Sequence, residues 1–322
     1  MKGNNENKAG SAEEFSTVNS QLSIELNGIK KTYNKETVTA VKNISFSVNK
    51  GELFGLIGPD GAGKTTLFRI LTTLLLADEG TAMVNGFDVV KDYKQIRNCV
   101  GYMPGKFSLY QDLTIEENLN FFATVFGTTI KQNYDLIKDI YVQIEPFKDR
   151  RAGKLSGGMK QKLALCCALI HKPDVLFLDE PTTGVDAVSR KEFWEMLKRL
   201  KAQGITILVS TPYMDEANLC DRIALIQKGE ILSIDTPAKI IESFPQQLYA
   251  LHSSKTYKLL QDVRNYGGTD SCFAFGDSLH ATFKQGAEKE VVAYLQSKGN
   301  EDVEIKTITP SIEDCFIKLL KN

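Results

Sequence analysis

The stretch "GPDGAGKTT" at residues 58–66 decides the fold of this chain. A glycine, four further residues and then Gly-Lys-Thr make up the spacing of a phosphate loop. The apolar run "ELFGLIG" at 52–58 precedes it, as a buried strand entering a turn would, and a helical pattern follows from Lys64 to about Leu76. A strand, a glycine-rich turn and a helix in this order predict a loop that binds phosphates; a plain glycine-rich turn is the weaker interpretation.

Each residue type in this loop has a chemical role. The glycines let the backbone curl so that successive N–H groups converge on phosphate oxygens, and the helix that follows adds the positive end of its dipole. Lys64 can reach the β- and γ-phosphates of a nucleotide, and the Thr65 hydroxyl can ligate Mg²⁺. The candidate ATP-binding residues here are Gly58, Pro59, Asp60, Gly61, Ala62, Gly63, Lys64, Thr65 and Thr66.

A second apolar run, "DVLFLDE" at 174–180, supplies two carboxylates. It predicts a buried strand that carries Asp179 to the C-terminal edge of a sheet, beside the phosphate loop. Asp179 can hold Mg²⁺ there, usually through water, and Glu180 is placed to polarise an attacking water as general base. An Asp-Glu pair after a strand is a weak signal alone, because most such pairs are solvated, but it is strong downstream of a phosphate loop.

Strands and helices alternate through most of the chain. Besides the two runs above, we expect strands at 21–29, 40–48 and 205–210 and a helix at 187–201. Strands separated by helices predict a parallel sheet covered on both faces, and so an α/β fold of the P-loop NTPase class. Between about 106 and 153 the pattern is helical without strong strands, which predicts an inserted helical subdomain.

After about residue 235 the pattern changes to antiparallel strands and amphipathic helices. The expected strands lie at 246–253, 271–283 and 302–308, and the expected helices at 286–299 and 311–321. These elements predict a small α+β domain, in which no catalytic constellation is visible. We therefore divide the chain into a disordered tail at 1–21, a nucleotide-binding domain at 22–240 and an accessory domain at 241–322.

Composition limits the classes of function. Of the 322 residues, 42% are hydrophobic and 25% charged, as in a globular protein with a sizeable core. The net charge of −1 gives no basic field for nucleic acid, so no nucleic-acid partner is expected. The densest apolar patch, at 70–77, is shorter than the roughly 20 residues that span a bilayer. The six cysteines lack metal or redox spacing, and we expect Cys166 and Cys167 to be buried and reduced.

"LSGGMKQ" at 155–161 is the second decisive stretch. On its own it could be a plain helix cap, with Ser156 as N-cap. That interpretation is compatible with ligand binding, because a helix N-terminus with two glycines also binds an anion. Together with Tyr33 in "KKTYNKE", the phosphate loop, "VLFLDEPTTGVD" and "STPYMDEA", in this order, it makes residues 22 to about 235 resemble the ATP-binding subunit of ABC transporters.

The resemblance implies an ABC-type ATPase that works as a head-to-tail dimer with a second ATP-binding subunit. Each ATP would lie between the phosphate loop of one chain and the signature helix of the other. Tyr33 would stack on the adenine, although a lone aromatic is more often part of a core. Ser156, Gly157 and Gly158 would contact the γ-phosphate in the partner's site, and Asp186 would cross the interface.

The resemblance also implies a polytopic membrane permease as a separate subunit, with its coupling helix in a groove of the helical subdomain. Phe107, Leu109 and Tyr110 are candidates for that groove or for the core of the subdomain. The ending "ITPSIEDCFIKLL" at 308–320 is similar to the tail of subunits that serve exporters of drugs, lipids or antibiotics. A cytoplasmic protein, peripheral on the inner face of the cell membrane through the permease, is therefore expected.

Two residues depart from the family pattern. Gly105 in "GYMPGKF" stands where a glutamine is usual, and Pro212 stands where a histidine is usual. The glutamine amide touches Mg²⁺ and the attacking water, and the histidine hydrogen-bonds the γ-phosphate. Proline has no titratable group and no backbone N–H. Tyr213 turning inward would be one replacement.

Gly105 and Pro212 both belong to the site built on this chain's own phosphate loop. The groups that this chain would contribute to a partner's site, "LSGGMKQ" and Asp186, are intact. We therefore expect slow hydrolysis here, in a heterodimer whose other site is faster. Glu180 argues against a wholly inactive site, and a slow homodimer stays open. Two competing functions are a regulatory partner that does not hydrolyse ATP and a soluble ABC ATPase that acts on ribosomes or DNA, outside transport.

Overall fold

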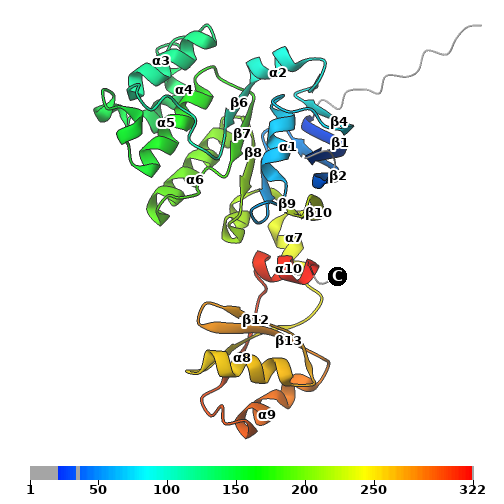
Figure 1. Ribbon diagram of the computed structural model, residues 1–322. Coiled ribbons are helices and arrows are strands. Elements are labelled where there is room, and N and C mark those ends of the chain that lie inside the picture. The colour runs from blue at the N-terminus through cyan, green and yellow to red at the C-terminus, as the bar shows by residue number, and fades with distance from the viewer. Residues whose placement is uncertain (1–20, 34–36, 321–322) are drawn as a thin grey trace, which may run out of the picture.

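A computed structural model describes residues 21–33 and 37–320. The tail expected at 1–21 lies outside the described residues except for Gln21. The described residues form three sheets, two in the larger upper part of Figure 1 and one in the smaller lower part. Within the described ranges, no helix has the length and apolar character needed to cross a bilayer.

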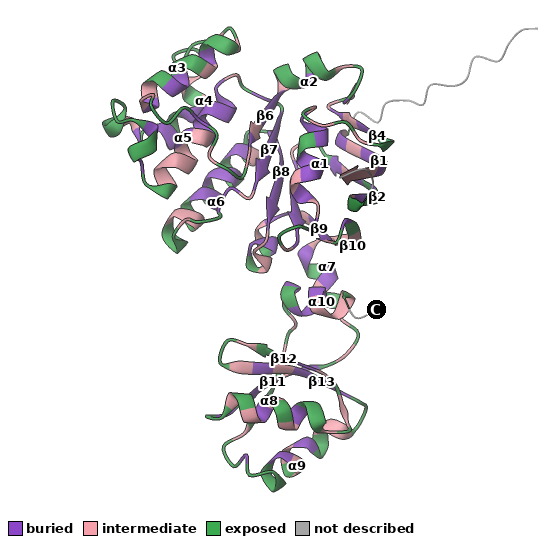
Figure 2. Ribbon diagram, in the orientation of Figure 1, coloured by how far each residue is buried: buried purple, intermediate pink, exposed green. Residues whose placement is uncertain are grey.

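The central sheet has the strand order β10-β9-β3-β8-β7-β6. Neighbouring strands are parallel except β9 and β10, which are antiparallel. Every residue of β3, β7 and β8 is buried, because helices cover both faces of the sheet, and this confirms the three apolar runs as strands (Figure 2). The strands are β3 Leu53–Ile57, β6 Val100–Met103, β7 Val175–Asp179, β8 Thr206–Thr211, β9 Arg222–Gln227 and β10 Glu230–Asp235.

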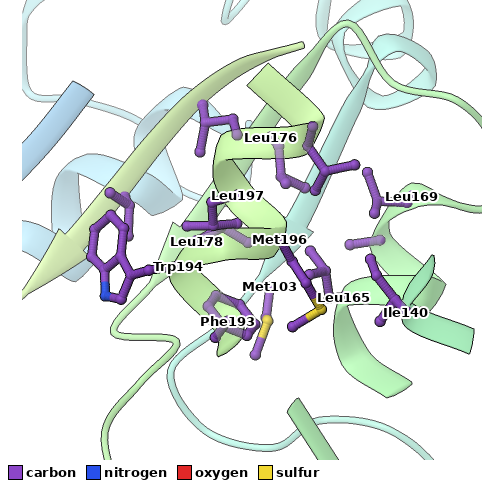
Figure 3. Close-up of a cluster of buried hydrophobic side chains, with 14 of the residues drawn as sticks. Met103, Ile140, Leu165, Leu169, Leu176, Leu178, Phe193, Trp194, Met196 and Leu197 are labelled. Atoms are coloured by element: carbon purple, nitrogen blue, oxygen red, sulfur yellow. The ribbon is translucent and has the colours of Figure 1, made fainter. Parts of the chain in front are cut away.

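Alternate residues of β3 face two different hydrophobic cores. Leu53 and Ile57 belong to the core that includes α5 (Gly157–Leu169) and α6 (Ala187–Ala202). Phe54 and Leu56 belong to the core on the other face, with α1 (Lys64–Leu71). Figure 3 shows the first core, in which α6 side chains such as Phe193 and Met196 meet residues of the sheet and of the helical subdomain. Cys166 and Cys167 are buried in this core, as predicted.

The helix after the phosphate loop is shorter than expected. α1 ends at Leu71, not near Leu76, and Thr73 has a φ of 62°. A positive φ lies outside the right-handed helical region, so the helix stops before it. A second sheet, order β2-β1-β4-β5, packs on this side of the molecule. Its elements are β1 Leu22–Tyr33, β2 Val38–Asn49, β4 Glu79–Val84 and β5 Phe87–Asp88, followed by α2 Tyr93–Cys99.

The helical subdomain lies between β6 and α5. It contains α3 (Ile115–Val125), α4 (Tyr134–Tyr141) and two short 3₁₀ turns, at Glu145–Phe147 and Ala152–Lys154. Thr114 starts α3 with a capping box, in which its hydroxyl accepts from the Glu117 amide while the Glu117 carboxylate accepts from the Thr114 amide.

The smaller unit contains an antiparallel sheet of order β12-β13-β11-β14. Helix α8 was not expected from the sequence. Helix α10 leaves this unit, because its Ile312, Cys315 and Phe316 join the core of the nucleotide-binding part beside α7 (Figure 1). The elements are α7 Pro237–Glu242, β11 Leu248–His252, α8 Thr256–Asn265, β12 Thr269–Phe275, β13 Ser278–Phe283, α9 Val291–Ser297, β14 Glu304–Ile308 and α10 Ile312–Leu319.

Candidate active site

The candidate site lies at the edge of the central sheet where four neighbouring parallel strands end. In the order β3, β8, β7, β6, these strands lead into the phosphate loop and into the segments that carry Pro212, Glu180 and Gly105. Carboxyl ends of parallel strands meet at one edge, so segments far apart in the sequence become neighbours here. The edge is therefore the place where groups from all four segments can act together.

Two glycines of the phosphate loop are required by close backbone contacts. A Cβ at Gly58 would lie 2.1 Å from the carbonyl oxygen of Ile226 on β9. Gly63 has a φ of 107°, and a Cβ there would lie 2.4 Å from the carbonyl oxygen of Ala40. Gly63 is also the N-cap of α1. The loop can therefore curl over the sheet only with glycine at these positions.

Lys64 lies folded over the loop. Its side chain is only 3% exposed, and Nζ donates to the carbonyl oxygens of Gly58 at 2.6 Å and Pro59 at 3.0 Å. Nζ also lies 3.1 Å from Oε1 of Glu180. The expected phosphate-binding cation and the expected base are thus in direct contact. A phosphate entering the loop would compete with Glu180 for this ammonium group.

Asp179 is held by a residue that the sequence analysis did not identify. Ser210, at the end of the neighbouring strand β8, donates from Oγ to Oδ1 of Asp179 at 2.7 Å. The same Oγ accepts from the Glu180 amide at 3.0 Å. Glu180 itself has a φ of 51°, a left-handed conformation that is uncommon outside glycine. Ser210 therefore orients both acidic residues, and its place as the polar end of "ITILVS" was the only signal.

The donor set suits Mg²⁺. Asp179 is buried and has one oxygen free of Ser210, and Thr65 is the second residue of α1. One or two protein oxygens, completed by water and phosphate oxygens, is the usual way in which proteins bind Mg²⁺. Within the described ranges, no cluster of three or more His, Cys, Asp or Glu side chains could hold a metal by itself. Thr65 and Asp179 would therefore hold the ion together with the nucleotide.

Tyr33 lies at the end of β1, next to the first turn of α1. Its hydroxyl is 3.3 Å from Oγ1 of Thr66. The end of β1 is held by Asp78, which accepts from Lys31 Nζ at 2.5 Å and from the amide and hydroxyl of Thr32. These bonds, that from Lys31 foremost, lower the pKa of Asp78 to about 2. Asp78 thereby fixes the strand end that carries Tyr33, a role that no sequence pattern had indicated.

The signature residues form a second group, at the start of α5. Ser156 is the exposed N-cap, and its Oγ accepts from the Met159 amide at 3.3 Å. A Cβ at Gly158 would lie 2.7 Å from Oγ of Ser189, so the helix start packs tightly on α6. Ser189 also donates to Asp186 at 2.7 Å, and its amide and hydroxyl lower the pKa of that carboxyl group. Ser156, Gly157 and Asp186 are all exposed.

The predicted site residues thus fall into two groups. The first contains Tyr33, the phosphate loop at 58–66 and the acidic pair at the end of β7, joined by the contacts of Lys64, Ser210 and Thr66. The second contains the signature residues and Asp186, and within it Gly158 and Asp186 both contact Ser189. The second group presents its polar edge to solvent.

The two departures from the family pattern have different surroundings. A Cβ at Gly105 would lie 3.0 Å from the Asp179 carbonyl oxygen and 3.8 Å from Cβ of Glu180. A side chain at position 105 would therefore start beside the expected base. Tyr213 follows Pro212, and its ring packs on the guanidinium group of Arg190. The distance from the ring centroid to Cζ of Arg190 is 4.1 Å. Tyr213 is thereby engaged with α6.

A groove of about 510 Å³ lies between the sheet and the helical subdomain. Apolar residues dominate its wall, and Arg97 and His171 add polar groups. Of the three groove candidates, Leu109 lines the groove and is also part of the core. Tyr110 is exposed against Phe121, and Phe107 lies under the Lys160 ammonium group. The main apolar residues of the wall are Leu74, Val100, Met103, Leu109, Phe122 and Val125.

Residues 41–183 match the family described as "ABC transporter". Over 304 residues the chain is 35% identical to the Nod factor export ATP-binding protein I of Rhizobium sp. (strain N33), which covers 93% of this chain and 97% of that protein. It is 40% identical over 302 residues to the probable multidrug ABC transporter ATP-binding protein YbhF of Escherichia coli (strain K12). That match covers 92% of this chain, which spans only about half (52%) of YbhF.

Solved structures agree with these relatives. An ATP-binding subunit of an ABC transporter superposes with a TM-score of 0.62 at 26% identity, covering 69% of this chain and 92% of that one. A dimeric bacterial ABC transporter cassette superposes with a TM-score of 0.60 at 25% identity, covering 66% and 98%. The chain therefore belongs to the family of ABC transporter ATP-binding proteins.

Proposed function

We propose that this protein is the ATP-binding subunit of an ABC exporter. It binds and hydrolyses ATP at a head-to-tail dimer interface and drives export through a separate membrane permease. The observation that carries this proposal is the division of the site into two groups within one chain. The phosphate loop has Lys64, Asp179 and Glu180 beside it, whereas the signature residues present an exposed helix start to another chain.

Each residue has a defined task in this scheme. The loop amides and Lys64 bind the β- and γ-phosphates, and Tyr33 lies where it can cover the base of the nucleotide. Mg²⁺ held at Thr65 and Asp179 would neutralise charge on the phosphates. Glu180, released by Lys64, accepts a proton from the attacking water. Ser156, Gly157 and Gly158 donate to the γ-phosphate in the partner's site, while Asp186 crosses the interface.

The nature of the cargo follows from the relatives alone. Their names refer to multidrug transport, Nod factor export and linearmycin resistance. We therefore propose export of a drug-like, lipid-like or antibiotic cargo. The first test is the ATPase rate of the purified chain, alone and with a second ATP-binding subunit, together with its ATP-dependent dimerisation. Absence of both turnover and dimerisation under all these conditions would contradict the proposal.

We propose that hydrolysis at this chain's own site is slow, because Pro212 offers no side chain that donates to the γ-phosphate. Pro212→His is expected to raise kcat about 10-fold or more, since one missing donor commonly costs about 10²–10³ in rate. The Kd for ATP should change little, because the loop and Lys64 provide most of the binding. Steady-state ATPase assays and nucleotide titrations measure both quantities.

The control is Tyr213→Phe, which keeps the ring on Arg190 and removes only the hydroxyl group. Its rate should equal that of the unaltered chain. A large loss would mean that the tyrosine hydroxyl already replaces the histidine. If the unaltered chain hydrolyses ATP rapidly and Pro212→His does not raise kcat, the proposal of slow hydrolysis at this site is contradicted. In that case the expected heterodimer with a faster partner would lose its support, and a homodimer would be favoured.

We propose that a permease docks in the groove beside the helical subdomain, at the inner face of the cell membrane. Val125 lines the groove and is 61% exposed. Val125→Arg would place a charge against the apolar segment expected there, at a cost of about several kcal/mol if the charge is buried without a partner. We expect less of the chain to sediment with membranes of the source cells, with the ATPase rate of the purified chain unchanged.

Val142→Arg is the matched control. Val142 is 51% exposed, follows α4 and does not line the groove. It adds the same charge on the same subdomain, so membrane sedimentation should be unaffected. Equal sedimentation of both variants and the unaltered chain would show that the groove is not where the permease binds.

A further inference from the structure

A second cavity, of about 160 Å³, lies directly beside Glu180. Three segments line it: the residues after β6, the first turns of α5 and the residues after β7. Gly105 belongs to the first segment, and Glu180 to the third. Since a Cβ on Gly105 would come within 3.8 Å of Cβ of Glu180, a longer side chain there would lie next to the base. Glycine at this position leaves the space empty of side-chain atoms.

The first turns of α5 place Gln161 in the wall of the same cavity. Gln161 carries the one side-chain amide among the lining residues, all of which fall within the described ranges. Its Oε1 is buried and has no hydrogen-bond partner among the described residues. A buried amide oxygen without a partner is unfavourable, and such a group in a native structure is explained by strain, by a catalytic role or by a bound water or ion.

The two charged groups at this cavity are engaged. The Lys160 ammonium group lies 5.4 Å from the centre of the Phe107 ring, and the Glu180 carboxylate contacts Lys64. A triphosphate that draws Lys64 away would free the carboxylate, leaving a base that needs an oriented water. An amide is suited to orienting it, because it both donates and accepts hydrogen bonds.

We infer that Gln161 is a positioning residue of this chain's own hydrolytic site. In the ATP-loaded protein its amide hydrogen-bonds a water beside Glu180 and so performs, from helix α5, the task for which Gly105 in the loop after β6 has no side chain. This inference rests on the proposed ATP hydrolysis. The inference adds Gln161 to that proposal, as a residue of the signature helix that acts on the nucleotide of its own chain and not only on the partner's nucleotide.

The test compares Gln161→Met with the unaltered chain under the conditions that give the highest ATPase rate. Methionine has a similar length and flexibility but no amide, so packing of α5 is retained. We expect kcat to fall about 10-fold or more, with the KM for ATP within about twofold and the melting temperature unchanged. A role limited to packing would lower the melting temperature without this split between kcat and KM.

Rescue provides the stronger evidence. Gly105→Gln in the Gln161→Met background would return an amide to the cavity from another segment of its wall, and we expect it to recover most of the lost kcat. The Cβ of residue 105 would meet the Asp179 carbonyl oxygen at 3.0 Å, so the melting temperature must be followed. Gln161→Glu, which keeps an acceptor oxygen at the same place, is the second variant and is expected to retain more activity than Gln161→Met.

Gln143→Leu is the matched control, because Gln143 is an exposed glutamine of the helical subdomain whose side-chain amide donates to the carbonyl oxygen of Asp139. It should leave kcat unchanged. If Gln161→Met keeps full turnover, the inference is wrong while the proposed function stands. It is also wrong if kcat falls but neither Gly105→Gln nor Gln161→Glu recovers it. If the unaltered chain neither hydrolyses ATP nor dimerises with it, the proposed function itself fails.

Discussion

Glu180→Gln is expected to reduce ATP turnover at this site by about 10²–10⁴-fold, the range that general-base catalysis contributes. Glutamine has the same shape as glutamate but does not accept a proton from water at neutral pH. It also removes the charge that lies 3.1 Å from Lys64 Nζ. Lys64 is then free to bind phosphate, and one negative charge facing the γ-phosphate is gone. ATP should therefore bind at least as tightly as before.

The same variant should accumulate as an ATP-bound dimer, because the nucleotide that joins the two chains is no longer consumed. ATPase assays measure the loss, and light scattering with and without ATP measures the dimer. Glu192→Gln is the control, since Glu192 pairs with Lys162 at 2.8 Å on the surface of α6. If the turnover of Glu180→Gln lies within about threefold of that of the unaltered chain, Glu180 is not the general base. An ATP-loaded Glu180→Gln chain that stays monomeric, with every partner offered, would overturn the dimer mechanism.

Lys64→Ala is expected to weaken ATP binding about 100-fold or more, equivalent to about 2.7 kcal/mol. The ammonium group sits inside the loop with contacts to two loop carbonyls, so it meets the phosphates without a large rearrangement. Alanine removes this charge-assisted contact and also leaves the Glu180 carboxylate unpaired near the phosphates, where it repels them. Both effects act in the same direction. Isothermal titration with Mg-ATP measures the change.

Lys162→Ala serves as the matched control, because Lys162 is a lysine of α5 paired with Glu192 away from the phosphate loop. Its Kd for ATP should be unchanged. Melting temperatures of both variants separate loss of binding from loss of folding, since Lys64 is nearly fully buried and its removal leaves loop carbonyls without a donor. If Lys64→Ala is folded and retains the ATP affinity of the unaltered chain, the loop does not bind the nucleotide as proposed.

Much of the fold could be predicted because its signals are short stretches of sequence. The buried runs at 52–58, 174–180 and 205–210 are strands of the central sheet, and the helical pattern at 106–153 corresponds to α3 and α4. The sequence-based predictions were wrong where contacts between distant segments decide whether a helix forms. Helix α8 has a weakly apolar sequence and forms because Leu259 and Val263 pack under the accessory sheet.

The placement of the last helix shows the same limit. The pattern at 311–321 predicted a helix, and its capping box of Ser311 and Asp314 is a local signal. Nothing local indicated that its apolar face would return to the core beside α7. Amphipathic periodicity shows which face of a helix is buried, but not against which partner.

The sequence by itself determined the phosphate loop, the two carboxylates at the end of β7 and the signature helix start, because glycine backbone freedom, strand length and helix capping act over a few consecutive residues. Only the tertiary structure decided that Ser210 holds Asp179, that Asp78 holds the strand before Tyr33, and that Gln161 shares a cavity with Glu180. The first and third of these depend on the strand order β3-β8-β7-β6 and on how α5 packs against its end, and the second depends on β1 lying beside β4 in the other sheet. Such long-range packing is the summed result of many weak contacts, which no single stretch of residues encodes.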